Sequence, residues 1–398
     1  MKQTLYELKD FPQNMLGQLK YSIFFIDHNI MDVEISDLGV KITHNSQKSD
    51  EEIQKQVDLL VSRFSSEEFV FEEKRIFENR VKVPYNSNIM EILLDKKIIK
   101  LLEPGIFTFR EPFTKLLKFL DDTFTRNIGY ALGASEEYYP ATIHGHTLNK
   151  VSHFTSFPEH LLFISHLKED LDILDEFSKE VKKSGGWSEE LSFDYTNKMT
   201  TPSHMMNPAT CYHCYEGMQG EQLDSDGIVV TAVSKVYRYE SKNHRDFGRL
   251  MDFTLREVIF VGKPDFVREK RGQALEILKK MVSDWELDCW IENANDPFFT
   301  NDFQVKASYQ RKQEMKFELR MQIPYLDKSI AVFSTNFHGN VFANAFDIKA
   351  GKRPAVTGCI GFGLERWVLA FLAQYGLDET CWPQSFREDF RKWQELNK

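Results

Sequence analysis

The sequence has few cysteines, no long apolar run and no excess of positive charge. Its five cysteines are an odd number without the spacing of a disulfide framework, so we expect reduced thiols and a cytoplasmic protein. No apolar stretch approaches the roughly 20 residues that cross a bilayer, and the charged start MKQTLYELKDFPQNM lacks the apolar segment of a signal peptide. The formal net charge of −10 gives no overall attraction for nucleic acid, so a polyanionic partner would need a local basic patch.

The 398 residues are enough for two domains, and they contain no repeat and no low-complexity tract. Pro104, Gly105 and Pro112 flank a short strand-like run, which marks a break in the pattern. We therefore predict a small N-terminal α+β domain over residues 1–112 and a second domain over residues 113–398.

The second domain begins with helical apolar spacing in FTKLLKFLDDTFTRNIGYAL and continues into EEYYPATI, which predicts a strand with Pro140 at an edge or a bulge. Two β-like runs, GIVVTAVSKVYRYE and RLMDFTLREVIFVG, are joined by the polar stretch SKNHRDFG, a pattern typical of a long hairpin. FELRMQIPYL and IAVFSTNFHGNVFANAF predict further strands. Strand runs that follow one another with few βαβ alternations favour an antiparallel sheet over a Rossmann fold.

Near the C-terminus, the stretch TGCIGFGLERWVLAFLAQYG places three glycines before a helix with one buried apolar stripe. The glycines imitate a dinucleotide fingerprint, but no acidic residue follows at the required distance, so we reject that site. Arg366 lies in the first turn of the helix and off the stripe. Because a helix N-terminus attracts anions, Arg366 is a candidate phosphate ligand, with a solvated arginine as the alternative.

The predicted hairpin carries further charges. Arg238 and Glu240 alternate with tyrosines and so lie on one face of the first strand, and Arg249 and Arg256 lie across the turn. Two interpretations stay open at this point. The charges either form cross-strand salt bridges on a solvated face or hold a triphosphate beside a flexible loop.

Two short motifs contain metal-binding residue types. CYHC supplies Cys211, His213 and Cys214, which without a second pair is a weak indication of zinc or redox chemistry. IHGH supplies His144 and His146, which are more often loop histidines than ligands. Neither motif forms a complete metal site by itself.

Taken together, these segments resemble the class II aminoacyl-tRNA synthetases. GFGLER is similar to the third motif of that class, YRYE with RLMDFTLRE to the second, and FTKLLKFLDDTFTRNIGYALGASEEYYPATI to the first, which lies at a dimer interface. The resemblance covers residues 113–398 and does not extend to the N-terminal domain predicted before them. It implies an α+β fold with an antiparallel sheet flanked by helices, a homodimer, and an enzyme that uses ATP.

Three segments narrow the resemblance. MMNPATCYHCYEG, FTLREVIFVG and TGCIGFGLERW resemble the atypical zinc-dependent seryl-tRNA synthetases and their truncated relatives, the amino acid:[carrier protein] ligases. This resemblance implies a catalytic Zn²⁺ held by Cys211, Glu257 and Cys359, with the fourth position open for the α-amino group of the substrate. Cys214 is then a bystander, and the alternative is that the two thiols are only packed.

The resemblance also implies roles at the nucleotide. Arg238 would bind the α-phosphate and the carboxylate of the amino acid, Glu240 would lie near the adenine edge, and Phe253 would stack on the adenine ring. Arg249 would reach the outer phosphates, and Arg366 would hold the γ-phosphate. The reaction would be attack of a carboxylate on the α-phosphate, giving an aminoacyl adenylate and pyrophosphate.

Magnesium would assist this reaction, but the strand before the third motif, SIAVFSTNFHGN, has no acidic residue. Glu318 on the neighbouring run is the candidate replacement.

Three hypotheses concern the acceptor. The first is an AMP-forming ligase that loads a small amino acid onto the phosphopantetheine thiol of a carrier protein, the second is a seryl-tRNA synthetase, and the third is a non-catalytic paralogue. The acidic balance and the lack of a basic N-terminal face favour the first and make tRNA the less expected partner. The resemblance to the carrier ligases implies that the helix FVREKRGQALEILKK would then dock an acidic carrier, and the alternative is a solvated helix face. The basic residues concerned are Arg268, Lys270, Arg271, Lys279 and Lys280.

Overall fold

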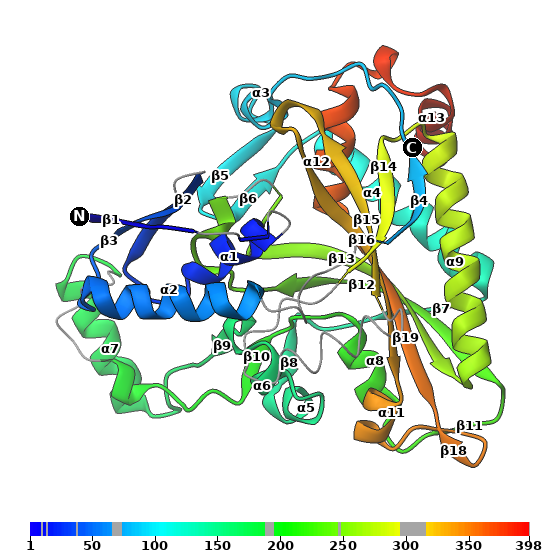
Figure 1. Ribbon diagram of the computed structural model, residues 1–398. Helices are drawn as coiled ribbons and strands as arrows, with labels where there is room; N and C mark the ends of the chain where they lie inside the picture. Colours follow the sequence, from blue (N-terminus) through cyan, green and yellow to red (C-terminus); the bar gives the residue numbers. More distant parts are fainter. Residues whose placement is uncertain are drawn as a thin grey trace.

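The computed structural model describes residues 1–8, 11–12, 15–36, 39–65, 74–187, 195–245, 248–294 and 316–397. Its centre is an eight-stranded sheet in the order β4-β14-β15-β16-β19-β13-β12-β7 (Figure 1). Every neighbouring pair is antiparallel except β12 and β7, which run parallel. The strands are β4 (Arg75–Asn79), β14 (Cys289–Asn293), β15 (Lys316–Ile323), β16 (Lys328–Gly339), β19 (Val356–Gly363), β13 (Asp252–Gly262), β12 (Gly227–Tyr237) and β7 (Ser135–Tyr138). The expected α+β fold around a mainly antiparallel sheet is thus confirmed.

Helices cover both faces of the middle of this sheet. One face packs on α4 (Phe113–Phe124), α9 (Pro264–Asp284), α12 (Leu364–Tyr375) and α13 (Gln384–Leu396), and the other packs on α5 (Gly145–Lys150), α8 (Cys211–Gly217) and α11 (Val341–Phe346). Alternate residues therefore enter different cores: Phe260 and Ile360 face α9 and α12, whereas Ile259 and Cys359 face α8. This alternation decides which residues of β13 and β19 meet at the candidate site.

The predicted hairpin is confirmed. β12 and β13 pair in register from Gly227 opposite Gly262 to Tyr237 opposite Asp252, and a 3₁₀ turn (Ser241–Arg245) lies in the connecting loop. EEYYPATI is not one strand. It divides into β7 and β8 (Thr142–His144), which belong to different sheets, because Pro140 between them has no N–H for a ladder.

A second expected strand also ends early. β16 stops at Gly339, whose φ of +59° turns the chain away from the sheet, and helix α11 follows. The run written as one strand in the sequence is therefore a strand followed by a short helix.

The N-terminal part of the chain builds a small unit of its own, called here the N-terminal module (residues 2–65). Its antiparallel sheet has the order β1-β3-β2, with β1 (Lys2–Tyr6), β2 (Ile30–Ser36) and β3 (Gly39–His44). Helices α1 (Leu16–Ile23) and α2 (Asp50–Ser65) complete a separate core (Figure 1). Four elements follow the module and belong to the main part of the chain. The first, β4, pairs within the large sheet. Residues of the other three pack in or against the main core; these are α3 (Ile89–Asp95), β5 (Ile99–Glu103) and β6 (Ile106–Phe109). The division into residues 1–112 and 113–398 stays a prediction.

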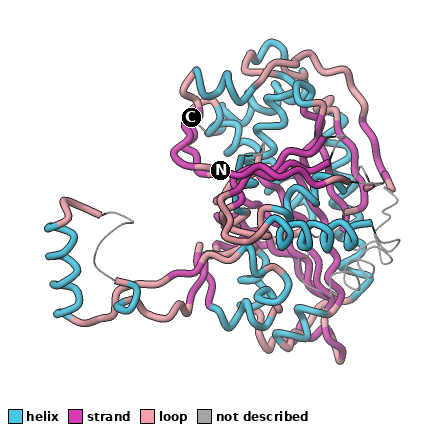
Figure 2. The backbone as a smooth tube through the Cα atoms, turned by 60° about the vertical axis from the view of Figure 1, so that its left-hand side comes forward, coloured by secondary structure: helices cyan, strands magenta, loops and turns pink. Residues whose placement is uncertain are grey.

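The segment between β8 and α8 includes α6 (His153–Ser156), a 3₁₀ turn (Pro158–His160), β9 (Phe163–Ile164), α7 (Leu171–Lys183) and β10 (His204–Met206). Figure 2 shows α7 standing away from the rest of the chain, and none of its side chains is buried. The short elements β11 (Gln222–Leu223), β17 (Lys349–Ala350) and β18 (Arg353–Pro354) form a small sheet at one end. No helix within the described ranges is long and apolar enough to cross a membrane.

Candidate active site

Three buried side chains converge on the α8 face of the central sheet. Cys211 begins α8, Glu257 lies on β13 and Cys359 lies on β19, and one donor atom from each lies within 4.8 Å of the other two. The register explains the meeting, because Ile259 pairs with Cys359 and Glu257 pairs with Gly361. A Cβ at Gly361 would lie 3.5 Å from Oε1 of Glu257, an ordinary van der Waals contact, so the carboxylate packs directly over β19.

The electrostatics of this group favour a bound cation. Burial raises the pKa of the Glu257 carboxyl, and Oε2 of Glu257 has no hydrogen-bond partner among the residues described. The hydrogen bond between the two thiols raises the pKa of Cys211 well above its ordinary value and lowers that of Cys359 well below it. A buried carboxylate beside a thiolate is costly unless a cation compensates the charge. Two thiols and one carboxylate are a donor set that suits Zn²⁺ and leaves a fourth position open.

Two polar side chains of β16 also approach the thiol of Cys359. The amide nitrogen of Asn336 and Nε2 of His338 each lie 3.8 Å from its sulfur. On the other side of the imidazole ring, Nδ1 of His338 lies 3.3 Å from the hydroxyl of Thr357 and 3.4 Å from that of Tyr215. These contacts orient the imidazole toward the sulfur.

The other candidate ligands lie outside this group. Cys214 is buried, and burial raises the pKa of its thiol to about 12. His144 caps α5, its Nδ1 accepting a hydrogen bond from the backbone N–H of His146 at 3.0 Å. None of these residues, nor His213, belongs to the cluster of possible metal ligands found in the described part of the chain. The role of the triad as zinc ligands, and of Cys214 as a bystander, stays a prediction.

Three of the four arginines singled out in the sequence share one region. Arg366 starts its helix beside β16, with Nε donating to the carbonyl of Gly248 at 2.8 Å and Nη1 to that of Ala331 at 3.3 Å. Burial, together with the nearby positive charges of Arg249 and Arg238, lowers the pKa of Arg366 to about 10, although the negative charge of Glu240 acts in the opposite direction. Like charges held together in a partly buried place are stabilised by an anion.

The partners of the other two arginines fix their positions. Nε of Arg238 donates to the carbonyl of Pro208 at 3.1 Å, and its guanidinium carbon lies 5.6 Å from the centre of the Phe253 ring. Arg249 donates to a carboxylate oxygen of Glu240, which is buried. The residues assigned to the nucleotide by resemblance thus lie in one region, linked by direct contacts or by electrostatic interactions. Their individual roles stay predictions.

The salt-bridge interpretation of the hairpin charges holds for two arginines, because Arg249 pairs with Glu240 and Arg256 pairs with two acidic residues. Arg256 is 3 % exposed and forms two parallel hydrogen bonds to Asp121 on α4, at 2.7 and 3.0 Å. It also donates to Glu136 on β7 at 3.1 Å. Arg256 is therefore a structural residue that links β13 to α4 and β7.

Two acidic residues near the arginines were missed in the sequence. Glu365 precedes Arg366 and is 1 % exposed; its carboxylate accepts from Thr254 and from Lys235. A glutamate in the first turn of a helix is the signal that could have drawn attention to it. Glu159 gave no signal, because it lies in a segment without a recognised motif.

Glu159 is held close to the segment that carries Arg238 and Glu240. Because β12 ends at Tyr237, these two residues follow the strand on which the sequence placed them. The backbone N–H of Tyr239 donates to the carbonyl of His160 at 3.1 Å, which ties the 3₁₀ turn to this segment. The side chain of Glu159 is 6 % exposed; its Oε1 lies 3.7 Å from Nε2 of His160, and neither oxygen accepts a hydrogen bond from another side chain among the described residues. Burial, followed by the negative charge of Glu240, raises its pKa to about 7.

The candidate magnesium ligand does not fit that role. Glu318 on β15 is paired with Lys316 at 3.1 Å and with Arg320 at 3.6 Å. Its carboxylate is thus already compensated by two cations, and no further cluster of acidic or histidine ligands forms within the ranges that the structure describes.

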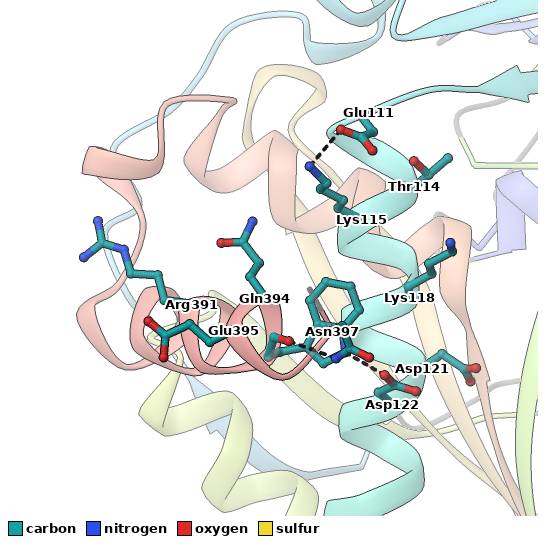
Figure 3. A pocket seen from close by; sticks show the side chains of 11 residues that line it. Glu111, Thr114, Lys115, Lys118, Asp121, Asp122, Arg391, Gln394, Glu395 and Asn397 are labelled. Atoms are coloured by element: carbon teal, nitrogen blue, oxygen red, sulfur yellow. Dashed lines mark hydrogen bonds and ion pairs between the residues drawn. The ribbon is translucent and has the colours of Figure 1, made fainter.

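Two cavities among the described residues bear on the candidate site. A cavity of about 310 Å³ borders the arginine region and is lined by Gly248, Arg249, Leu250 and His244 among others. A larger one, of about 700 Å³, lies between α4 and α13 (Figure 3). Two of its acidic groups are already bonded, Asp121 to Arg256 and Asp122 to the indole N–H of Trp393 at 2.6 Å. The larger cavity contains none of the candidate site residues.

Comparisons with known proteins find relatives in sequence and neighbours in fold. No protein-family profile matches the chain. It is 29 % identical over 301 residues to a type-2 serine–tRNA ligase of Methanococcus aeolicus and 28 % identical over 302 residues to one of Methanocaldococcus jannaschii. These matches cover 74 % and 73 % of this chain but 57 % of each relative, so the chain spans little more than half the length of these relatives.

Solved structures give the fold. The crystal structure of M. kandleri SerRS in complex with A. aeolicus tRNASec superposes with a TM-score of 0.71 at 21 % identity, covering 98 % of this chain and 77 % of that one. A cytoplasmic serine–tRNA ligase of Naegleria fowleri in complex with AMP superposes with a TM-score of 0.60 at 11 % identity, covering 86 % of this chain and 70 % of that one.

The prediction of a carrier protein as the acceptor is wrong. The prediction that tRNA is the less favoured partner is wrong with it. The relatives found by sequence are tRNA ligases by name. The physical reason for the error lies in α9, whose basic residues have partners within the chain. These are Asp265 for Arg268, the carbonyl of Leu132 for Lys270, the hydroxyl of Thr335 for Arg271, Glu276 for Lys279 and Asp284 for Lys280. The basic residues of α9 are therefore already engaged within the chain and do not form a surface reserved for an acidic partner. The chain has the fold of a class II synthetase and is similar in sequence to the type-2 serine–tRNA ligases.

Proposed function

We propose that the chain is an ATP-dependent, AMP-forming ligase that activates serine and transfers it to tRNA. The observation that carries the proposal is the buried group of Cys211, Glu257 and Cys359 beside Arg238, whose positive charge acts on the Glu257 carboxyl. A metal that takes the amine of an amino acid, beside an arginine that takes a phosphate, would bring together the two substrates of amino acid activation. The names of the sequence relatives support serine and tRNA as the substrates.

The triad would hold Zn²⁺, which when bound supplies a Lewis acid that can take the α-amino group of the amino acid. The chain itself orients that centre. Asn336 and His338 approach the sulfur of Cys359 from β16. An amino acid fixed there by its amine would direct its carboxylate toward Arg238.

The arginines would bind and align the triphosphate. Arg238 would hold the α-phosphate and the amino acid carboxylate, Arg366 and Arg249 the outer phosphates, and Phe253 the adenine ring. A carboxylate oxygen would then form a bond to the α-phosphorus while the bond to the bridging oxygen of pyrophosphate breaks. Positioning and charge stabilisation by preorganised donors account for most of the acceleration in such reactions. A terminal hydroxyl of tRNA would next attack the activated carbonyl and release AMP.

No step is assigned to magnesium. Glu318 is engaged with Lys316 and Arg320, so the described side chains do not form a ready magnesium site. A homodimer also belongs to the proposal. β7 lies at the edge of the large sheet with all four residues exposed, which leaves that edge available to a second copy.

Exchange of labelled pyrophosphate into ATP, measured with each amino acid in turn, tests the activation step. Serine should support exchange well above the other amino acids, and Arg366→Ala should abolish it. Exchange that no amino acid stimulates would contradict the proposal and favour a non-catalytic binding protein. Cys214→Ser is the matched control, because this buried thiol lies outside the triad.

A further inference from the structure

The N-terminal module touches the loop that connects β12 and β13. Near the end of α1, the carbonyl of Tyr21 accepts a hydrogen bond from the side-chain amide of Asn243 at 3.3 Å. Lys242 donates to the carbonyl of His28 at 2.6 Å. Both Asn243 and Tyr21 are buried, the latter with 4 % of its surface exposed. The loop is therefore in firm contact with a part of the chain that is far away in the sequence.

The ring of Tyr21 lies against the candidate nucleotide site. The guanidinium carbon of Arg249 is 5.1 Å from the centre of this ring, within the range of a cation–π contact. Burial raises the pKa of the Tyr21 hydroxyl, and the charged groups that also act on it are Glu240, Arg249, Glu159 and Arg238. Two of these groups are arginines of the proposed phosphate site.

Arg249 thus has supports from two different parts of the chain. Glu240, on its own hairpin, accepts a hydrogen bond from Nη1, and Tyr21, from the N-terminal module, offers the face of its ring. A guanidinium has five N–H donors in a fixed plane. A ring against its face restricts its orientation without using any of these donors.

We propose that Tyr21 is a positioning residue of the nucleotide site, by which the N-terminal module holds Arg249 in the orientation that binds the phosphates. The proposal rests on the proposed function in one respect, because it takes Arg249 as a phosphate ligand. It goes beyond that function in making the N-terminal module part of the ATP site. Since linkage is reciprocal, ATP binding should also stabilise the module.

The test measures ATP binding by calorimetric titration on the full chain, together with KM for ATP and for serine in the exchange reaction. Tyr21→Ala should weaken ATP binding by about 2- to 30-fold, the range of a cation–π contact, and should raise KM for ATP while KM for serine stays within about twofold. Tyr21→Phe keeps the ring and should bind ATP as the native chain does.

Ile42→Ala is the matched control. Ile42 is fully buried in the core of the same module, whereas the contacts of Arg249 given above are with Glu240 and Tyr21. It should lower the unfolding temperature and leave ATP affinity unchanged. Native ATP affinity in Tyr21→Ala, or an equal loss in Ile42→Ala or Tyr21→Phe, would overturn the proposal. A chain that binds ATP with this pattern but charges no tRNA would refute the proposed acceptor alone, whereas a chain that does not bind ATP would refute both.

Discussion

The carboxylate of Glu365 accepts two hydrogen bonds from Thr254, one from its backbone N–H at 2.8 Å and one from its hydroxyl at 2.7 Å. Thr254 lies on β13 and Glu365 in the first turn of α12, 111 residues further along the chain. Lys235 on β12 adds a third contact at 3.2 Å. This junction holds the first turn of α12, and with it Arg366, against the hairpin that carries Arg238 and Arg249.

Glu365→Gln should destabilise the fold measurably. The amide keeps one acceptor oxygen but loses the charge that faces Lys235, and it cannot accept both bonds from Thr254. A buried donor left without its partner costs about 1–3 kcal/mol of unfolding free energy, which urea denaturation would detect. Glu388→Gln on α13 is the control: this exposed residue bonds only to Gln384 in the contacts described, so the change should stay within about 0.5 kcal/mol. Equal effects of the two substitutions would show that the junction contributes nothing.

Arg256 and Arg366 should separate stability from activity. Arg256→Ala leaves Asp121 without its paired hydrogen bonds, and loss of one partner of a buried ion pair costs about 3–5 kcal/mol; the lower end applies because Asp121 is partly exposed. Arg366→Ala should unfold close to the native midpoint, because it removes a charge that burial and like charges already disfavour, and should abolish pyrophosphate exchange. If Arg366→Ala were the less stable variant, Arg366 would be a structural residue.

The metal prediction is tested on purified protein by elemental analysis. The native chain should hold one zinc ion, and Cys359→Ser should lose most of it, because removal of one thiolate leaves two of the three protein ligands. Cys214→Ser should keep the metal. Removal of zinc with a chelator should lower the unfolding temperature of the native chain and leave that of Cys359→Ser unchanged. Full zinc content in Cys359→Ser would exclude the triad.

The pH dependence of stability should carry a signature of Glu159. Its pKa is raised to about 7 from an ordinary value of 4.5, so between these values the folded state binds a proton that the unfolded state releases. The unfolding free energy should therefore fall as pH rises from about 4.5 to about 7, by at most roughly 3–4 kcal/mol from this group. Glu159→Gln, which is neutral at every pH, should flatten this fall, and the exposed Glu51→Gln should not. Parallel profiles for the native chain and Glu159→Gln would rule out the shift.

The elements that the sequence predicted well are those with local patterns. The alternating pattern of β12 and β13 made the hairpin recognisable, and the glycines before α12 did the same for the helix that carries Arg366. The resemblance then predicted that Glu257 and Cys359 lie together, and the structure has them on one face of the sheet. The contacts of Tyr21 with Arg249 and of Asp121 with Arg256 join residues far apart in the chain, so no local pattern contains them. The acceptor was misjudged for a related reason: composition counts charges, whereas only the fold shows which of them are already paired, as in α9.

The measurement that tests the central claim most directly is an acceptor assay with radiolabelled serine, ATP and total tRNA. The account predicts that label becomes attached to tRNA in a form released by mild alkali, that Cys359→Ser and Arg366→Ala lose this charging, and that Cys214→Ser keeps it. Serine-dependent pyrophosphate exchange without any label on tRNA would contradict the proposed acceptor, and the absence of both reactions would contradict the account as a whole.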